Sequence, residues 1–154
     1  MSALITPQEV IDIAFAANTN MSPDSISEVV IHIAERKYIK PALGNLYEEL
    51  HTKEYQKFAE EYIKPALAYF VKCEIMPSLA VSLSNNGLAL ASPQYMATAT
   101  DKQRQMLYDS ELHKANLLLN EAIEYIHKHV EKFPMFDNNG VQQKHKTSNC
   151  GFIL

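Results

Sequence analysis

"TKEYQKFAEEYIKPALAYFVKCEIMPSLA", residues 52–80, is the stretch that decides the fold class. Its large apolar side chains recur every three or four positions, which is the period of one face of an α-helix. The face comprises Tyr55, Phe58, Ala59, Tyr62, Ile63, Ala66, Phe70, Cys73 and Met76. Thr52 can cap this helix at its start. Pro65 predicts a kink or a split, because proline removes a backbone donor and clashes with the preceding turn.

Two shorter helices are expected before this long one. "TPQE", Thr6–Glu9, combines a capping hydroxyl, a proline at the first helical position and a carboxylate three residues after the cap, so a helix should begin here and run to Asn18. Ser22-Pro23 opens a second helix in the same way. It should stop before Pro41, since a proline disfavours the helical conformation in the preceding residue. The expected apolar stripe of this second helix is Ile26, Val29, Val30, Ile33 and Lys37/Tyr38.

Further along, Gly44 marks a tight break before a short helix that carries Leu46, Tyr47 and Leu50. "TDKQ" at 100–103 repeats the capping pattern and begins a last helix that ends at Phe133-Pro134. Between them the helical period disappears, in "SLSNNGLALASPQYMAT" at 82–98. The turn signals there predict an extended loop or an irregular β hairpin.

The predicted fold is therefore an all-α helical bundle. Two long antiparallel helices, residues 53–81 and 101–132, are joined by the projecting loop, and the short N-terminal helices pack across them. Residues 1–136 form one domain, and residues 137–154 form a flexible C-terminal tail without helical or strand period. With only four glycines and no tryptophan in 154 residues, a turn-rich β sandwich is disfavoured.

Charge and composition disfavour several classes of function. The net charge of −4 is spread along the chain, which leaves no basic footprint for binding nucleic acid. No run of apolar residues is long enough to cross a membrane, and no secretory leader is expected. The two cysteines, Cys73 and Cys150, have no metal-binding spacing and favour a reduced, intracellular protein.

No catalytic residue, metal ligand or cofactor is predicted. His127 and His129 are two positions apart on a helix, which directs them to different faces, and the other histidines are isolated. The paired carboxylates at Glu48-Glu49 and Glu60-Glu61 diverge by about 100 degrees on a helix and are expected on solvated faces. Cys73 lies on the apolar stripe and is expected to be a core thiol. An enzyme whose acid and base lie far apart in the sequence stays open as an alternative.

A repeated hexapeptide and the tyrosines leave two questions open. "YIKPAL" occurs at 38–43 and again at 62–67, but two copies are too few for a solenoid, which needs about three units to bury a continuous core. The eight tyrosines are expected at the edge of the core, although some could line a subunit interface.

The chain ends in "TSNCGFIL", residues 147–154, where apolar side chains follow a polar spacer. One interpretation is a frayed terminus. The other is a tether, in which the spacer delivers a short apolar segment to a groove on another subunit. A prenyl anchor is excluded as an interpretation, because Cys150 is fifth from the end and the motif needs it fourth.

The chain resembles a known family in "LITPQEV" at 4–10, "YIKPALGNLYEEL" at 38–50 and "KFPMF" at 132–136. With the helical layout between them, these motifs are similar to the small helical head-to-tail connector (adaptor) proteins of tailed bacteriophages, of the kind found in phages of gut Bacteroides-type bacteria. The resemblance covers residues 4–136.

The resemblance implies a structural protein of the virion, assembled in the bacterial cytoplasm and located at the junction of capsid and tail. Copies of the chain would form a ring, commonly of twelve, below the portal protein and above tail or second-ring proteins. DNA would pass through without specific binding, and no membrane would be involved. The family's C-terminal segments commonly insert into the portal, and its projecting hairpin packs against neighbouring copies or the next ring.

Two groups of contact residues follow from the resemblance. In the tail they are Asn149, Cys150, Gly151, Phe152, Ile153 and Leu154. In the loop they are Asn86, Gly87, Leu88, Leu90, Pro93 and Tyr95. The alternative from another class is a small helical regulatory or scaffolding protein that binds one host partner through an exposed helix face.

Overall fold

A computed structural model describes residues 2–17, 19–86 and 101–136. These residues are mainly helical, and none of them is in a strand, which confirms the predicted all-α class. The helices are α1 (Pro7–Ala14), α2 (Glu28–Ala34), α3 (Lys40–Leu43), α4 (Leu46–Glu49), α5 (Gln56–Phe58), α6 (Lys64–Asn86) and α8 (Asp101–Lys128). Two π-helical turns, η2 (Glu35–Ile39) and η3 (Ala59–Ile63), and two 3₁₀ turns, η1 (Pro23–Ser25) and η4 (Val130–Lys132), complete the set.

The first helix begins as its sequence predicts. The Thr6 hydroxyl accepts a hydrogen bond from the backbone N–H of Glu9, and the Glu9 carboxylate accepts one from the backbone N–H of Thr6. Pro7 occupies the first helical position, where no intrahelical donor is needed. α1 ends at Ala14, four residues earlier than the expected boundary at Asn18.

Both copies of the repeated hexapeptide adopt the same local structure. In each, a π-helical turn ends one residue before a lysine and a proline: the N–H of Lys40 bonds the carbonyl of Glu35, and the N–H of Lys64 bonds the carbonyl of Ala59. A wider turn relieves the clash between a proline ring and the carbonyl four residues earlier. The repeated sequence therefore forms a π-helical turn that allows the helix to continue past a proline.

Because of this π turn, the second helix does not end before Pro41 as predicted. Lys40 precedes Pro41 yet keeps helical dihedral angles, with φ −57° and ψ −45°, and the helix continues through η2 and α3 to Leu43. Ile39 and Leu43 are both fully buried, so packing offsets the local preference against a helix before proline. At Pro65 the chain also stays helical, and the predicted disruption takes the form of η3.

Gly44 ends this first long helical run. Its φ of +59° lies in the left-handed region, which only glycine enters without strain. The chain turns there into α4, as the break predicted from the sequence requires.

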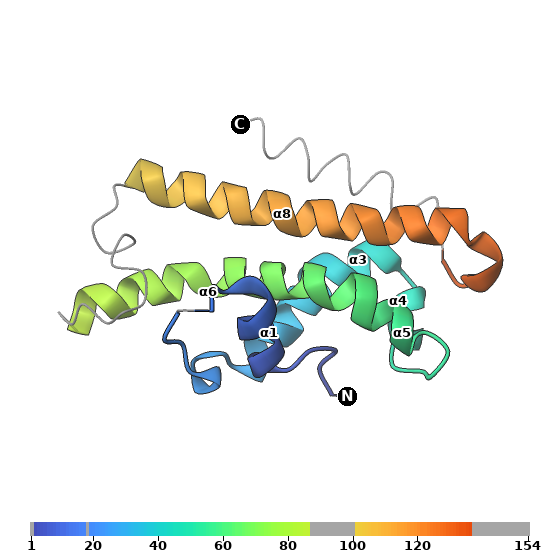
Figure 1. Ribbon diagram of the computed structural model, residues 1–154, viewed down its shortest axis with the longest axis horizontal. Helices are drawn as coiled ribbons and strands as arrows, with labels where there is room; N and C mark the ends of the chain where they lie inside the picture. The colour runs from blue at the N-terminus through green and yellow to red at the C-terminus, as the bar shows by residue number, and fades with distance from the viewer. Residues whose placement is uncertain (1, 18, 87–100, 137–154) are drawn as a thin grey trace.

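Two long helices dominate the molecule (Figure 1). α5, η3 and α6 form one continuous helical rod, and α8 runs beside α6 in the opposite direction. This confirms the predicted antiparallel pair. Residues 82–86 are part of α6, which corrects the loop expected at 82–98. The remainder of that predicted loop, residues 87–98, lies outside the described residues.

The N-terminal helices α1 and α2 pack against α6, so α6 is contacted by α1, α2 and α8. The core between them contains large side chains with no exposed surface, among them Ile31, Ile39, Leu43, Ile63 and Phe70. Each fully buried large apolar side chain of this core contributes roughly 1.5–3 kcal/mol to stability.

The apolar stripe expected on the second helix is partly wrong. Ile26 is buried and Val30 is half-buried, but Val29 is 65% exposed and Ile33 is 46% exposed. The buried face of α2 is made instead by Ile31 and Ala34. Two large apolar side chains are therefore left on the outside of a short helix.

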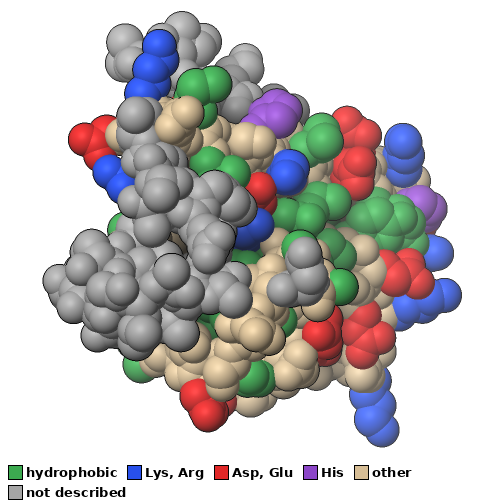
Figure 2. All heavy atoms as spheres, turned by 60° about the vertical axis from the view of Figure 1, so that its left-hand side comes forward, with side chains coloured by type: hydrophobic (Ala, Val, Ile, Leu, Met, Phe, Trp, Pro, Cys, Tyr) green, Lys and Arg blue, Asp and Glu red, His purple; other side chains and the backbone are tan. Residues whose placement is uncertain are grey.

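The surface carries charges of both signs. On the face drawn in Figure 2, acidic and basic side chains are interspersed with hydrophobic ones and no large field of one sign is seen. Within the described ranges, no helix is both long and apolar enough to cross a membrane.

Candidate functional site

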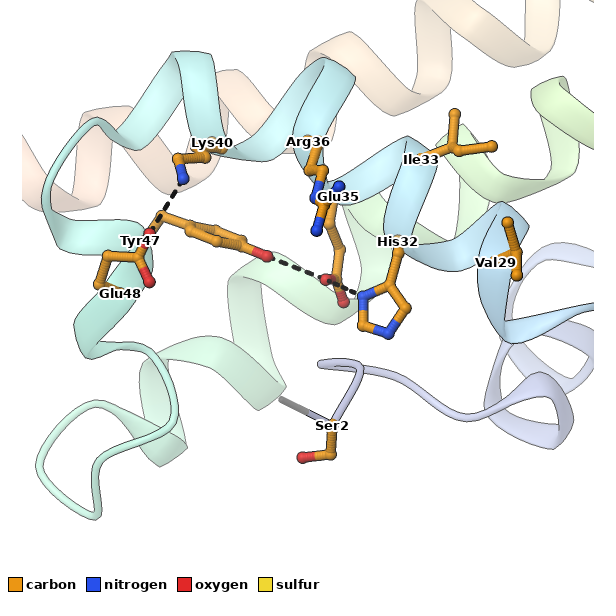
Figure 3. Close-up of a pocket in the computed structure, with 9 residues that line it drawn as sticks. All are labelled: Ser2, Val29, His32, Ile33, Glu35, Arg36, Lys40, Tyr47 and Glu48. Atoms are coloured by element: carbon orange, nitrogen blue, oxygen red, sulfur yellow. Dashed lines mark hydrogen bonds and ion pairs between the residues drawn. The ribbon is translucent and has the colours of Figure 1, made fainter.

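A pocket of about 480 Å³ lies where α2, η2, α3 and α4 meet the N-terminal segment (Figure 3). Its lining consists of Ser2, Val29, His32, Ile33, Glu35, Arg36, Lys40, Tyr47 and Glu48. Eight of these residues come from two stretches, 29–40 and 47–48; the first contains the π turn η2, and Gly44 lies between them. The local structure that carries the helix through Pro41 thus also shapes this pocket.

The carboxylate of Glu35 forms the floor of the pocket and is only 1% exposed. Its Oε1 accepts a hydrogen bond of 2.6 Å from the backbone N–H of Leu4, and its Oε2 accepts one of 3.0 Å from the Tyr47 hydroxyl. His32 Nδ1 lies 3.3 Å from the same Oε2. Both oxygens of a buried carboxylate are therefore engaged, as the high cost of leaving such a group unpaired requires.

Glu35 joins two segments that are separate from it in the chain, the N-terminal segment through Leu4 and α4 through Tyr47. It also contacts His32, one helical turn earlier on the same run of helix. Burial, together with the charge of Glu35, raises the pKa of Tyr47 to about 12, so the hydroxyl stays protonated and keeps donating across the ordinary pH range. The floor of the pocket is thus a fixed structural anchor.

The rim of the pocket differs in character from the floor. Val29 and Ile33 lie on one side, one helical turn apart, with Arg36 following on the same run of helix (Figure 3). Lys40 closes the other side, where its Nζ lies 3.0 Å from Glu48 Oε1 and 5.6 Å from the centre of the Tyr47 ring. Arg36 forms no ion pair with any residue in the described part of the chain. We call Val29, Ile33, Arg36 and Lys40 the α2 surface.

The chemistry of the α2 surface suits recognition of a protein. Apolar side chains left on a rigid helix, beside a guanidinium and an ammonium group, offer contact area and charge specificity to a partner. Among the described residues, no group of three or more histidine, cysteine, aspartate or glutamate side chains is arranged to hold a metal ion.

A second buried carboxylate lies between the two long helices. Glu111 of α8 is 4% exposed, with Oε1 3.0 Å from Lys114 Nζ and Oε2 3.3 Å from Lys72 Nζ. Oε2 accepts no hydrogen bond from a described residue, so its contact with Lys72 is electrostatic. Lys72 Nζ also donates a hydrogen bond of 3.0 Å to the carbonyl of Ala14, which links α8 to α1 through α6.

A third polar cluster joins η2 to α6. Glu74 Oε1 accepts hydrogen bonds of 2.7 Å from both Lys37 Nζ and the Tyr38 hydroxyl. Burial alone would raise the pKa of Glu74, but these two hydrogen bonds together with the positive charge of Lys37 outweigh it and lower that pKa. Burial and the nearby Glu74 raise the pKa of Tyr38. The Tyr38 ring is stacked on Phe70 at 4.2 Å, so the cluster is part of the packing of the bundle.

The cysteine of the long helix is buried, as the sequence predicts. Burial and the charge of Glu111 raise the pKa of Cys73 to about 12, which removes the thiolate that a nucleophile needs. Cys73 is therefore a core thiol.

The contact residues predicted from the resemblance fall almost entirely outside the described residues. These are Gly87, Leu88, Leu90, Pro93 and Tyr95 in the loop, and Asn149, Cys150, Gly151, Phe152, Ile153 and Leu154 in the tail. Asn86 is the last residue of α6, and its side chain is not described. Both sets therefore stay predictions.

The pocket residues themselves were not singled out from the sequence. Glu35 carried a signal, because a single carboxylate sits between Ala34 and Ile39 on what proves to be a buried face. The sequence pattern places Val29 and Ile33 on the core stripe, and only the tertiary packing shows that the buried face is rotated toward Ile31 and Ala34.

Comparison with known proteins identifies a family. Residues 30–146 match the family of unknown function DUF6712, and this range contains most of the pocket, both long helices and the segment between them. Neither a curated protein nor a solved structure matches the chain. Because the match covers well over half of the sequence, the chain belongs to the DUF6712 family.

Proposed function

We propose that this protein is a structural head-to-tail adaptor of a tailed bacteriophage. In this proposal its copies form a ring below the portal protein, join the capsid to the tail and surround the passage for DNA. The protein then resides in the virion after assembly in the bacterial cytoplasm. The proposal extends the resemblance carried by "LITPQEV", "YIKPALGNLYEEL" and "KFPMF".

The observation that carries the proposal is the α2 surface. Val29 at 65% and Ile33 at 46% exposure lie beside Arg36, which forms no ion pair with any described residue, and Glu35 fixes this helix from below. A rigid surface of this kind, on a small helical body, is typical of proteins that work by contact with neighbours. The interspersed charges and the net charge of −4 agree with a DNA passage that should not retain DNA.

The test is attachment to a portal. The full-length protein and the portal protein encoded in the same genome are purified, mixed and separated by size, and the complex is imaged by electron microscopy. We expect co-elution and a ring of this protein on one end of the portal. Separate elution at all ratios would contradict the adaptor function.

The tail gives a second arm of the same test. A variant that lacks Gly151–Leu154 should retain the helical fold, measured by circular dichroism, and should pull down less portal protein, because the apolar end of the tether is gone. Unchanged capture of the portal by this variant would remove the tether from the proposal and leave the ring in place.

The exposed α2 surface also favours one alternative, a small helical regulatory or scaffolding protein that binds a host partner. Mass measurement separates the two. A ring former associates with itself as its concentration rises, whereas a regulatory protein keeps a fixed small stoichiometry with its partner.

A further inference from the structure

The α2 surface has a complementary surface on the same chain. On the outward face of α8, Leu117 is 52% exposed, and Glu121 and Glu124 follow it at intervals of four and three residues. Helical spacing places these three side chains along one side of α8. Glu121 and Glu124 are exposed and form no ion pair with any residue that the structure describes. We call Leu117, Glu121 and Glu124 the α8 surface.

The two surfaces have the same order of chemistry along their helices. On the α2 surface, Ile33 is followed by cations three and seven residues later, at Arg36 and Lys40. On the α8 surface, Leu117 is followed by carboxylates four and seven residues later. Seven residues of α-helix span about 10 Å, and on the α2 surface part of this length is the π turn η2. Two helices laid parallel can therefore match apolar with apolar and cation with carboxylate.

The surfaces do not overlap on one molecule. α2 and α8 each pack against α6 through a buried face, made by Ile31 and Ala34 in α2 and by residues such as Ala115 and Leu119 in α8. Their exposed faces point away from those contacts, and α8 lies along the outer edge of the molecule (Figure 1). A copy can thus use its α2 surface and its α8 surface at the same time, with different neighbours.

We propose that the α2 surface of one copy docks on the α8 surface of the next. Val29 and Ile33 pack on Leu117, Arg36 pairs with Glu121, and Lys40 pairs with Glu124. Such a contact joins two different surfaces, so it is heterologous and generates a ring or an open chain of copies. The inference rests on the proposed function for the ring, and it supplies the lateral contact within it.

The existing pair between Lys40 and Glu48 does not oppose this docking. Both side chains are about half exposed, and an exposed pair of this kind contributes little to stability. Lys40 can therefore exchange one carboxylate for another. The contact area of a single helix pair is small, so one interface is weak and closing a ring strengthens it through multivalency.

The first experiment uses two variants that each disable one surface. Ile33→Asp removes the α2 surface and Leu117→Asp removes the α8 surface; both positions are half exposed, so the fold should be retained, as checked by circular dichroism. By sedimentation velocity at up to about 1 mM, wild-type protein should associate and each variant alone should be monomeric. An equimolar mixture should form a dimer and stop there, because each variant keeps the surface that the other has lost.

Met106→Asp is the matched control, since Met106 is a 62% exposed apolar residue of the same helix outside the α8 surface. It should associate like the wild type. Wild-type protein that stays monomeric, a mixture that stays monomeric, or equal loss of association in the control would each overturn the proposal.

Charge exchange tests the parallel register. Arg36→Glu and Glu121→Arg should each weaken association by about tenfold or more, and the combined variant should recover most of it. No recovery in the combined variant would overturn the pairing. Failure of the adaptor function is distinguishable from these outcomes: a protein that self-associates as described but ignores the portal refutes the function and leaves the contact standing. Conversely, Ile33→Asp that binds the portal while wild type fails to self-associate refutes the contact alone.

Discussion

The hydroxyl of Tyr47 donates a hydrogen bond of 3.0 Å to the buried carboxylate of Glu35, twelve positions earlier in the chain. The bond spans Gly44, the one described residue with a positive φ, and it joins η2 to α4 across that turn. The backbone N–H of Leu4, in the N-terminal segment, donates a hydrogen bond to the other oxygen of the same carboxylate. One acidic side chain thus fixes the geometry of the pocket beneath the α2 surface.

Removing either end of this bond should destabilise the fold. Tyr47→Phe removes the hydrogen bond that the Tyr47 hydroxyl donates to Glu35, and we expect the free energy of unfolding to fall by about 1–2 kcal/mol. Glu35→Ala leaves both Leu4 N–H and the Tyr47 hydroxyl unpaired, and we expect a larger loss of about 3 kcal/mol. Denaturation in urea measures both. Glu35→Gln keeps one acceptor oxygen and should fall between them; a Glu35→Ala protein as stable as wild type would contradict this role.

The same pair predicts an alkaline dependence of stability. The pKa of Tyr47 is raised to about 12 in the folded protein from an ordinary value of 10, mainly by burial and then by Glu35. Folding therefore favours the protonated hydroxyl. The contribution of the Tyr47 hydroxyl to the free energy of unfolding should be complete below pH 10 and should be lost as the pH rises from 10 to about 12. Urea denaturation across this range measures it.

Tyr47→Phe is the control for that measurement, because it retains Tyr38, Cys73 and the other groups that titrate at high pH. Its stability should fall less steeply between pH 10 and 12 than that of the wild type. Parallel slopes for the two proteins would show that Tyr47 is not the group responsible.

The ion cluster at Glu111 allows a test of what buried charge contributes. Glu111→Ala removes the carboxylate that pairs with Lys72, and we expect the free energy of unfolding to fall by about 2 kcal/mol. This is less than the roughly 3–5 kcal/mol expected for a fully buried pair, because Lys114 is half exposed. Replacing both partners, Lys72→Met with Glu111→Leu, should return the stability to within about 1 kcal/mol of wild type. A double variant less stable than Glu111→Ala would contradict this account.

Cys73 should be inert in the folded protein. Burial and Glu111 raise the pKa of its thiol to about 12, so the thiolate is scarce at neutral pH and reagents cannot reach it. Alkylation with iodoacetamide, read from the mass of the peptide that contains Cys73, should proceed only after denaturant is added. Rapid labelling without denaturant would mean that the α6–α8 contact opens.

The predicted loop offers a separate test of assembly. Changing Leu88 and Leu90 to Asp should leave the thermal unfolding of the monomer unchanged and should reduce self-association at high concentration, if the loop contacts neighbouring copies. A lowered melting temperature of the monomer would instead assign these leucines to its own core.

Local features of the sequence decided much of the secondary structure. Thr6, Pro7 and Glu9 specify a helix start through bonds that span only three residues, and Gly44 specifies a turn through its own dihedral angles. The apolar period from Tyr55 to Met76 specifies a helical rod, because side chains three and four apart share one face wherever the helix lies. Such short-range causes can be read directly from the residues.

Other features depended on packing that the sequence does not display. The helix passes Pro41 and Pro65 through π turns, because buried residues such as Ile39 and Ile63 offset the local preference against it.

The residue sequence by itself determined an all-α chain with two long helices and a cysteine in the core, since these follow from period and propensity. The tertiary structure alone decided that Glu35 is a buried anchor and that Val29 and Ile33 remain outside. The physical reason is the rotation of α2 about its own axis. This helix has several apolar positions, and its contact with α6 decides which of them are buried. The residues left uncovered by that choice form the surface on which the proposed assembly depends.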